Sequence, residues 1–586
     1  MIKINQLKPI FPSVYHENLR SMLAHSVSKW GEKDAFIIKH KIPSSKEVSY
    51  EHVTYLDFQN RINALGTAMF RRGWQDKRVA IIGQNCCQWL ESYFAVLGGL
   101  GIVIPLDKGL PYEELESSLI RSYADILIFD AAHKDMAMYL MENNTSQVKH
   151  FICMDKLEGF ETVESLREEG KAALDAGFLD YLNLPIDSES MSIILFTSGT
   201  TSMSKAVMLS QKNITSNIYS LLKIEDIRSE DVNMAFLPYH HTFGSTGQLV
   251  MLAAGVTTAF CDGLKYLQAN MVEYKVSIFF CVPLLIESIY KRIMATVKKQ
   301  GLESKIQFGL KLTKFLLKFG IDIRRKVFKP VLDQLGGNIR LVISGASAID
   351  PEALNGFIDF GIMAVQGFGM TESAPVLAAE NHIERKCGSI GLAIPGVELA
   401  IDEPNAEGVG ELIAHGPNIM SGYYENPEET AKTLAGGWLH TGDLAYIDND
   451  GYIFICGRKK NVIVLKNGKN VYPEEIELLI SNLPYVEENM VYGKPRHDDG
   501  DQNDLALCAK IVYKPDYFLD NHGIDTCGGT NADATAQIEA YIKEDIDKIN
   551  DTLPSYKQLL RLNITDEPMV KTTTGKVKRF EEIKGL

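Results

Sequence analysis

Short apolar runs, separated by longer stretches with helical periodicity, dominate the first two thirds of the chain. The clearest runs lie at 79–83, 126–129, 151–154, 193–196, 277–281 and 341–344. Runs of this kind are typical of strands buried on both faces of a sheet, and residues 88–97 have the spacing of a helix. Alternating strands and helices favour an α/β fold, in which parallel or mixed sheets carry helices on both faces. In such sheets ligands bind at the carboxyl ends of the strands.

Composition and charge exclude several classes of protein. A chain of 586 residues is long enough for two or more domains. Its formal net charge of −15 is opposite in sign to that of most proteins that act on nucleic acid, so we expect no nucleic-acid partner. Nine scattered cysteines without a C-x-x-C pair indicate reduced thiols. Since we find no signal segment and no apolar run long enough to span a bilayer, we expect a cytoplasmic protein.

The pattern changes after about residue 400. Short strands with tight turns are expected at 410–415, 451–456 and 462–466. We therefore expect a large N-terminal domain, residues 1–457, and a small α+β domain, residues 458–586. Within the small domain the polar stretch 516–533 is predicted to be an exposed loop.

The run at 193–196 opens into a loop of small hydroxyl residues that ends in a lysine. The residues of interest are Thr197, Ser198, Gly199, Thr200, Thr201 and Lys205. Small residues let backbone N–H groups approach an anion, hydroxyls add donors, and the lysine adds a point charge suited to phosphate. The P-loop of NTPases is excluded, because Ser204 precedes the lysine and Ala206 follows it. Taken alone, the loop is either a polyphosphate site or a Ser/Thr-rich connector.

Two further segments suit a nucleotide. The run 366–372 (Gln-Gly-Phe-Gly-Met-Thr-Glu) follows an apolar stretch, and its two glycines flank an aromatic ring that suits a flat base. Thr371 and Glu372 add oxygen ligands that can hold a phosphate and Mg²⁺. Asp443 and Arg458 suit a ribose, since a carboxylate that accepts both hydroxyls is a common nucleoside-binding device. The alternative for the last pair is two unrelated surface charges.

In their order along the chain, these segments resemble the motifs of the adenylate-forming (AMP-binding) superfamily. The family patterns are T-S-G-T-T-G-x-P-K-G at 197–206, L-P-L-x-H-x-x-G at 237–244, G-Y-G-M-T-E at 367–372, T-G-D at 441–443, G-R at 457–458 and P-K-T-x-x-G-K at 570–576. The chain departs from them at Ser202, Ser204, Ala206, Tyr239, Phe368 and Val570. Residues 344–347 resemble a further family segment, S-G-G-A, in which Ala346 replaces a glycine. The resemblance covers residues 55–579 and is nearest to the long-chain fatty acid–CoA ligases.

The resemblance implies a role for each matching residue. It implies that adenine is framed by Gly345, Ala346, Gln366, Gly367, Phe368 and Gly369, beside Thr371. It further implies that Glu372 holds Mg²⁺, that Asp443 and Arg458 bind ribose, and that His241 lines the carboxylate pocket. Lys576 then corresponds to the adenylation lysine and Lys460 to the hinge of the small domain. Gly468, Lys469 and Asn470 belong to a loop that resembles the family's thiolation loop.

The implied reaction joins a carboxylic acid to ATP, giving acyl-AMP and pyrophosphate, and then transfers the acyl group to a thiol. Residues 232–261 contain no Asp or Glu, and Phe236, Tyr239, Phe243 and Leu249 lie among them. We therefore expect an apolar tunnel and a medium- to long-chain fatty acid rather than an amino acid. No carrier domain follows Lys576, so CoA is the expected acceptor. A free acyl carrier protein and a non-catalytic nucleotide-binding relative are the alternatives.

One segment falls outside these motifs. Residues 291–330 hold twelve Lys or Arg against two acids, and apolar residues recur at helical spacing at 308, 312, 315, 316 and 319. A basic amphipathic helix of this kind suits peripheral contact with the anionic inner face of a membrane, or with another anionic ligand. The alternative is a solvated helix whose apolar stripe belongs to the core, and the sequence favours neither.

Overall fold

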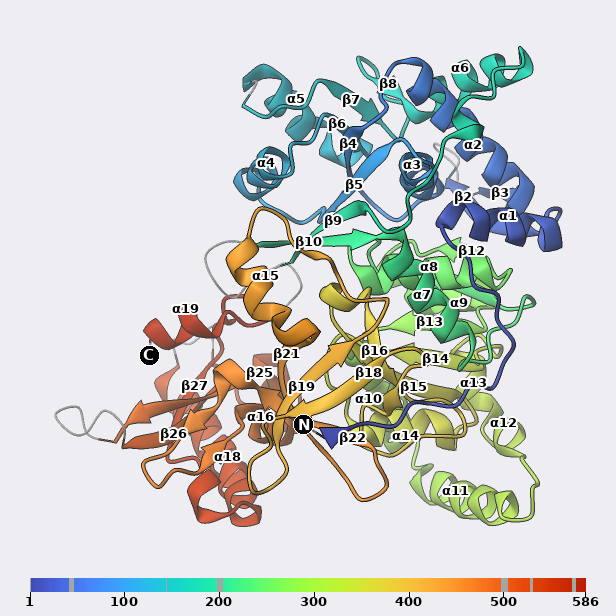
Figure 1. Cartoon of the computed structure of the whole chain (residues 1–586). Coiled ribbons are helices and arrows are strands. Elements are labelled where there is room, and N and C mark those ends of the chain that lie inside the picture. Colours follow the sequence, from blue (N-terminus) through green and yellow to red (C-terminus); the bar gives the residue numbers. More distant parts are fainter. Residues whose placement is uncertain are drawn as a thin grey trace.

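We describe the protein from a computed structural model, shown in Figure 1. The structure describes residues 2–41, 47–143, 145–197, 204–496, 504–526, 531–571 and 576–585. Within this part of the chain the strands form three larger sheets and two small ones.

The first sheet has eight strands in the order β20-β10-β9-β5-β4-β6-β7-β8. They are β4 (Lys77–Ile82), β5 (Gly101–Leu106), β6 (Ile126–Phe129), β7 (His150–Cys153), β8 (Glu161–Thr162), β9 (Met191–Thr197), β10 (Lys205–Ser210) and β20 (Gly422–Tyr423). Neighbours from β9 to β8 are parallel, whereas β10 and β20 are antiparallel additions at one edge.

Helices cover both faces of this sheet. Along β4, Val79 and Ile81 enter one core with α2, α3 and α6, whereas Ala80 and Ile82 enter another with α4 and α5. This alternation follows from the two-residue repeat of a strand. The helices are α2 (Tyr55–Arg71), α3 (Cys87–Leu97), α4 (Tyr112–Arg121), α5 (Lys134–Asn143) and α6 (Val163–Asp175).

The second sheet has nine strands in the order β17-β16-β15-β14-β13-β11-β12-β2-β3. They are β2 (Asp34–Lys41), β3 (Val48–Thr54), β11 (Val232–Ala235), β12 (Thr257–Phe260), β13 (Ile278–Cys281), β14 (Leu341–Ser344), β15 (Met363–Gly369), β16 (Val376–Ala379) and β17 (Leu392–Ala393). Its central strands, β2 and β11 to β15, are parallel. One face shares a core with the first sheet, so the two sheets form one packed body.

Helices cover this sheet too. Those on the shared-core face are α1 (Leu19–Trp30), α7 (Gln211–Leu222) and α8 (Thr242–Ala253). Those on the other face are α9 (Leu267–Glu273), α10 (Pro283–Lys299), α13 (Lys329–Gln334) and α14 (Pro351–Asp359). Two further helices, α11 (Glu303–Leu317) and α12 (Arg324–Val327), lie at the periphery (Figure 1).

The third sheet is antiparallel and has the order β1-β18-β19-β21-β22. Its strands are β1 (Ile2–Lys3), β18 (Glu398–Asp402), β19 (Gly410–His415), β21 (Leu439–Ile447) and β22 (Ile453–Arg458). The short helix α15 (Pro427–Thr433) lies between β20 and β21 in the chain.

The C-terminal part has its own hydrophobic core, made by residues between 463 and 564. Its strands are β23 (Ile463–Val464), β24 (Asn470–Val471), β25 (Val486–Pro495), β26 (Leu505–Tyr513) and β27 (Arg561–Thr565). Its helices are α16 (Pro473–Ser481), α17 (Pro515–His522), α18 (Ala532–Thr552) and α19 (Arg579–Lys584). A separate core is what a separate domain needs; the boundary at residues 457/458 stays a prediction.

The predicted α/β class is confirmed, and each of the six apolar runs contributes to a strand. The prediction of an exposed loop at 516–533 is wrong for residues 516–522, and residues 527–530 of that stretch lie outside the described residues. Residues 515–522 form α17, because Pro515 fits the first turn of a helix and Phe518 is fully buried in the C-terminal core. The polar composition of this stretch reflects the exposed face of that helix.

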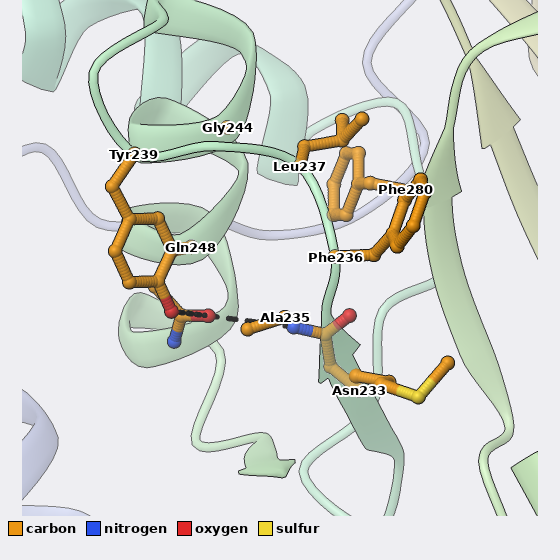
Figure 2. A pocket seen from close by; sticks show the side chains of 9 residues that line it. Asn233, Ala235, Phe236, Leu237, Tyr239, Gly244, Gln248 and Phe280 are labelled. Atoms are coloured by element: carbon orange, nitrogen blue, oxygen red, sulfur yellow. Dashed lines mark hydrogen bonds between the residues drawn. The ribbon is translucent and has the colours of Figure 1, made fainter. Parts of the chain in front are cut away.

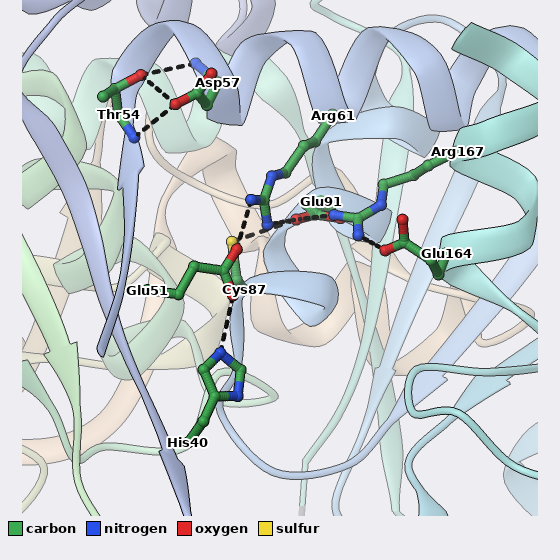
Figure 3. A network of polar contacts seen from close by, with 9 residues as sticks. All are labelled: His40, Glu51, Thr54, Asp57, Arg61, Cys87, Glu91, Glu164 and Arg167. Carbon is green, nitrogen blue, oxygen red and sulfur yellow. Dashed lines mark hydrogen bonds and ion pairs between the residues drawn. The ribbon is translucent and has the colours of Figure 1, made fainter. Parts of the chain in front are cut away.

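A buried carboxylate ties three helices of the first sheet together (Figure 3). Glu91 of α3 has no exposed surface, and both of its oxygens lie 3.0 Å from Arg167 Nη1 of α6. Arg61 of α2 approaches the same carboxylate at 3.7 Å. Two cations on one buried anion make this a structural ion-pair network rather than a binding site, because its charges already satisfy one another.

Among the helices that the structure describes, none combines the length and the apolar character needed to cross a bilayer.

Candidate active site

Asp443 and Arg458 face each other across the third sheet. They are opposite in the β21–β22 register, and Arg458 Nε donates to Asp443 Oδ1 at 2.7 Å. Asp443 is buried, with 5 % of its surface exposed. Burial raises the pKa of Asp443 to about 6, although Arg458 and Lys576 both favour the charged carboxylate. The structure therefore brings together the two residues of the predicted ribose pair. A polar group of a bound ligand could form a further hydrogen bond to the Asp443 carboxylate.

Lys576 reaches the same place from the C-terminal end of the chain. Desolvation lowers the pKa of Lys576, Arg458 lowers it further, and Asp443 and Glu372 oppose the shift. Lys576 in turn contributes to the lowered pKa of His241, whose first cause is burial. The Lys576 ammonium group therefore lies among charged protein groups of both signs. The structure thus brings together five residues that the resemblance assigns to the adenylation site, namely His241, Glu372, Asp443, Arg458 and Lys576.

Two more lysines add positive charge beside them. Desolvation lowers the pKa of Lys460, and Arg458, Lys205 and Lys576 add to this effect. Each of these cations disfavours the charged state of the neighbouring cations, because like charges repel at short range. A bound polyanion would relieve the repulsion, so the cluster has the electrostatics of a polyphosphate site.

Lys205 is linked to Glu372 through an aromatic ring. It begins β10, opposite Thr197 of β9, and its Nζ lies 4.8 Å from the ring centroid of Tyr423. The Tyr423 hydroxyl donates to Glu372 Oε1 at 2.8 Å, and Lys205 also forms an ion pair with Glu429. Sequence reasoning missed Tyr423 and Glu429. No local signal marks Glu429, which lies 224 residues from its partner in the chain.

Glu372 fits the predicted magnesium site. It is buried, and the hydroxyl of Tyr423 occupies only one of its carboxylate oxygens. A single protein carboxylate is a usual contribution to Mg²⁺ that also binds substrate phosphates. Lys205 contacts the ring of Tyr423, whose hydroxyl binds Glu372, and the charge of Glu372 acts on Lys576, so phosphate-binding charge lies near that carboxylate.

The predicted adenine segment forms the ends of two adjacent strands. Ser344 of β14 is in register with Gln366 of β15, so 345–346 and 366–369 lie side by side. Gln366 is buried and its Nε2 donates to the carbonyl of Ser389. Gly367 and Phe368 continue β15, and Thr371 begins the short turn that follows it.

Two glycines here are required by close approach. A Cβ on Gly369 would lie 1.9 Å from the carbonyl oxygen of Pro375, and one on Gly345 would lie 3.1 Å from the ring of Phe243. Ala346 has a φ of 77°, in the left-handed region that favours glycine. The family pattern has glycine at this position, so the backbone conformation is kept here although the residue differs.

Two histidines and an aspartate form a second cluster next to this site. His240 Nε2 lies 3.4 Å from Asp107 Oδ1, and ligand atoms of Asp107, His240 and His241 all lie within 4.8 Å of one another. Burial lowers the pKa of His241 and lowers that of His240 to about 3. Both rings are therefore neutral near pH 7, and His241 can hydrogen-bond a substrate carboxylate. The three side chains also have the spacing of metal ligands, as the donor types would allow.

A small cavity lies behind this cluster (Figure 2). Its volume is about 10 Å³, room for about one water molecule. It is lined by Asn233, Met234, Ala235, Phe236, Leu237, Tyr239, Gly244, Gln248 and Phe280. Tyr239 Oη donates to Gln248 Oε1 at 3.2 Å, and Asn233 Nδ2 approaches the same oxygen at 3.4 Å.

This cavity differs from the expected apolar tunnel. The aromatic rings of Phe236 and Phe280 line it, and Leu249 is buried in the core and is not among its lining residues. Asn233 and Gln248 form a polar end of this cavity. Because both side chains are uncharged, a prediction that considered only acidic residues in 232–261 did not identify them. An acyl chain would have to displace these rings in order to extend past them.

The loop resembling the thiolation loop lies within the C-terminal part. Gly468 has a φ of 78° in an exposed turn, and Asn470 pairs with Val464 in the β23–β24 hairpin. Lys469 Nζ lies 4.1 Å from the ring centroid of Tyr556, a residue of the same part. In this structure Lys576 lies within the electrostatic reach of Asp443 and Glu372, and Lys469 contacts Tyr556 of its own part of the chain.

Four of the predicted phosphate-loop residues lie outside the described residues, namely Ser198, Gly199, Thr200 and Thr201. The two ends of the loop, Thr197 and Lys205, are described and lie opposite each other in the β9–β10 hairpin.

Comparisons with known proteins show the family and the fold. The family model for the AMP-binding enzyme matches residues 23–424. The chain is 28% identical over 576 residues to "Long-chain-fatty-acid–CoA ligase 5" of Mus musculus, covering 91% of this chain and 82% of the relative. It is 26% identical over 456 residues to the feruloyl-CoA synthase of Amycolatopsis sp, covering 76% and 81%.

A solved structure shows the same fold. The anthranilate CoA ligase AuaEII, in complex with anthranoyl-AMP, superposes with a TM-score of 0.72 over 98% of both chains at 20% identity. The chain thus belongs to the AMP-binding enzyme family, as an AMP-forming acid–thiol ligase of the acyl-CoA synthetase kind. The acids named for these relatives are aliphatic and aromatic, so family membership leaves the acid open.

Proposed function

We propose that the protein activates a medium- to long-chain fatty acid with ATP, and then transfers the acyl group to CoA. The observation that carries the adenylation step is the meeting of Lys576 with Asp443, Arg458 and Glu372. These residues come from distant parts of the chain. Together they provide the groups that bind a nucleoside triphosphate: an acceptor for the ribose hydroxyls, cations for the phosphates and a carboxylate for the metal ion.

In the first step a carboxylate oxygen of the acid forms a bond to the α-phosphorus of ATP, and the bond to the bridging oxygen breaks, releasing pyrophosphate. Lys576 would hold the α-phosphate and the carboxylate as negative charge gathers between them. Lys205, with the loop that precedes it, would hold the β- and γ-phosphates. Donors placed where charge develops are the largest single contribution in many enzymes.

The remaining residues would position the substrates. Asp443 would accept the ribose hydroxyls beside Arg458, and the glycines at 345 and 369 would let adenine approach the backbone beside Phe368. His241 would donate to the acid. Glu372 would hold Mg²⁺, which, when bound, would neutralise part of the phosphate charge.

In the second step the thiol of CoA attacks the acyl carbon and AMP leaves. We propose that residues 458–586 form a mobile domain that turns about Lys460, exchanging Lys576 for the loop at 468–470. Two observations support this: the separate core of 463–564, and the engagement of Lys469 with Tyr556 while Lys576 is at the site. One pose serves adenylation and a second would serve thioester formation.

The proposed acid rests on residues 232–261, which contain no Asp or Glu and carry the apolar side chains of Phe236, Tyr239, Phe243 and Leu249. Asp107 is the nearby carboxylate, and its pairing with His240 makes it a poor partner for an ammonium group. An aromatic acid is a second candidate, because the cavity is short and is lined by the rings of Phe236, Tyr239 and Phe280. A relative named as a feruloyl-CoA synthase supports testing it.

The test is ATP–pyrophosphate exchange with a panel of fatty acids of increasing length, aromatic acids and amino acids. We expect the highest rates with fatty acids and no exchange with amino acids. The variant Asp443→Asn, measured in parallel, shows that the exchange belongs to this site. Higher rates with an aromatic acid would replace the proposed acid with the second candidate, and higher rates with an amino acid would reject both.

We propose CoA as the acceptor and a free acyl carrier protein as the alternative. Thioester formation from purified acyl-AMP, measured with CoA and with a holo-carrier protein, decides between them. We also propose a cytoplasmic location. The described cysteines are all free thiols, as expected in a reducing compartment.

A further inference from the structure

Helix α11 exposes a row of aromatic side chains to solvent. Phe308 and Phe315 on this helix are 70% and 58% exposed, and Phe319, just after it, is 67% exposed. The rings of Phe315 and Phe319 pack edge-on, with centroids 5.2 Å apart. The sequence allowed this row to be part of the core, and the structure shows that it is not. Large exposed apolar patches mark interaction surfaces.

The opposite face of α11 makes the helix's contacts with the rest of the protein. Gly309 and Thr313 are its buried residues, and a Cβ on Gly309 would lie 3.1 Å from Val327 and 3.3 Å from Phe328. These positions are four residues apart and so lie on one side of the helix. The helix is therefore anchored through one face, and its aromatic row is directed away from that anchor.

Basic residues surround the aromatic row. Among the residues that the structure describes, Lys305, Lys311 and Lys318 form no ion pair, whereas Lys314 pairs with Asp359 at 2.8 Å. The segment 291–330 carries twelve cations and two acids in a chain whose net charge is −15. The surface here is thus locally opposite in charge to the protein as a whole.

We propose that this face of α11 docks on an anionic lipid bilayer, with the three phenylalanines inserted at the level of the headgroups. Exposed aromatic rings flanked by unpaired lysines are the pattern of interfacial helices. We favour a lipid surface as the partner because insertion of side chains into a bilayer needs no cavity in the protein. The position of α11 at the edge of the molecule also leaves it accessible to a membrane (Figure 1). Cations beside the rings then meet the negative surface potential of the membrane.

The inference goes beyond the proposed reaction and does not depend on the acid. None of the described helices can cross a bilayer. Docking through α11 would nevertheless hold the enzyme at the membrane, in which hydrophobic acids dissolve. Binding can be measured without substrate, so failure of the docking proposal and failure of the proposed activity are separate results.

The experiment is flotation of the full chain with vesicles of phosphatidylcholine, alone or mixed with phosphatidylglycerol. We expect binding to the anionic vesicles only. The binding should be strong at about 0.01 M salt, where charges act over about 30 Å, and weak at about 1 M salt, where they act over about 3 Å. The Lys311→Glu/Lys318→Glu double variant should weaken it by about tenfold or more.

The aromatic row is tested by the triple variant Phe308→Ser/Phe315→Ser/Phe319→Ser, which should lose binding at every salt concentration. Phe580→Ser is the matched control, because Phe580 is 65% exposed on the unrelated helix α19. ATP–pyrophosphate exchange with a water-soluble acid checks that each variant is folded. Equal binding of the triple variant and the unaltered protein, equal binding to neutral vesicles, or loss of a self-associated form instead of vesicle binding would each overturn the proposal.

Discussion

Replacing Lys576 with alanine tests the adenylation pose directly. The substitution removes one cation from the group that includes Arg458 and Lys460, and it leaves Asp443 and Glu372 in place. Because Lys576 already loses hydration in this position, its charge acts more strongly on a bound phosphate than it would in water.

The size of the effect follows from what remains. Loss of one preorganised donor to developing charge costs about 2.7–4 kcal/mol, or about 10²–10³ in rate. We expect acyl-AMP formation to slow by this factor and not more, since Lys205 and Arg458 still contact the nucleotide in the proposed site. Thioester formation from supplied acyl-AMP should change little, because the proposed second pose moves Lys576 away.

The two half-reactions are measured separately, by ATP–pyrophosphate exchange and by thioester release from acyl-AMP and CoA. Lys571→Ala is the matched control: Lys571 belongs to the same C-terminal segment but forms an ion pair with Glu488 of β25. It should affect neither step. If Lys576→Ala slows both steps equally, or slows neither, the reasoning from the observed pose is wrong.

Four further predictions concern the hinge, a strained turn, a buried charge and pH. Lys460→Pro fixes φ and removes an N–H, so acyl-AMP formation should persist while thioester formation is lost, with Lys460→Ala active in both; loss of adenylation would contradict this. Ala346→Gly should stabilise the fold by about 1 kcal/mol by relieving the positive φ, and an unchanged Tm would refute it. Glu91→Ala strands two arginines and should cost about 3 kcal/mol, whereas exposed Glu164→Ala should cost at most about 1 kcal/mol; equal losses of Tm would count against the network. The KM for ATP should rise as pH falls through about 6, because burial raises the pKa of Asp443 and only the carboxylate accepts both ribose hydroxyls; Asp443→Asn should abolish that pH dependence, and its persistence would assign it elsewhere.

Much of the fold was predictable, because a strand buried on both faces must be a short apolar run. The runs at 126–129 and 341–344 coincide with β6 and β14 residue for residue. Shorter strands were less predictable: 462–466 yields only the two residues of β23. Helix α17 was missed, because one buried ring, Phe518, is too weak a signal against a polar background.

The candidate site was predictable where its chemistry is local. Gly369 and Glu372 occur in one continuous run, and Asp443 and Arg458 lie on neighbouring strands of an antiparallel pair. The contacts of Lys205 with Tyr423 and Glu429 were not predictable, because they join a hairpin of the first sheet to residues more than two hundred positions later. Asp107 likewise enters the histidine cluster only through the packing of the first sheet against the second, because Asp107 follows β5 and the histidines follow β11.

Residue order alone settles which chemical groups this chain offers and which strand each one follows, because side-chain chemistry and backbone periodicity are properties of adjacent residues. Tertiary packing settles what those groups meet. It places Lys576 within the electrostatic reach of Asp443 and Glu372, it buries Leu249 in the core, and it turns the phenylalanines of α11 outward. Each of these outcomes depends on which side of a helix or loop packs against the rest of the protein. The residues of that helix or loop do not determine this choice by themselves, because it depends on segments that are distant in the chain.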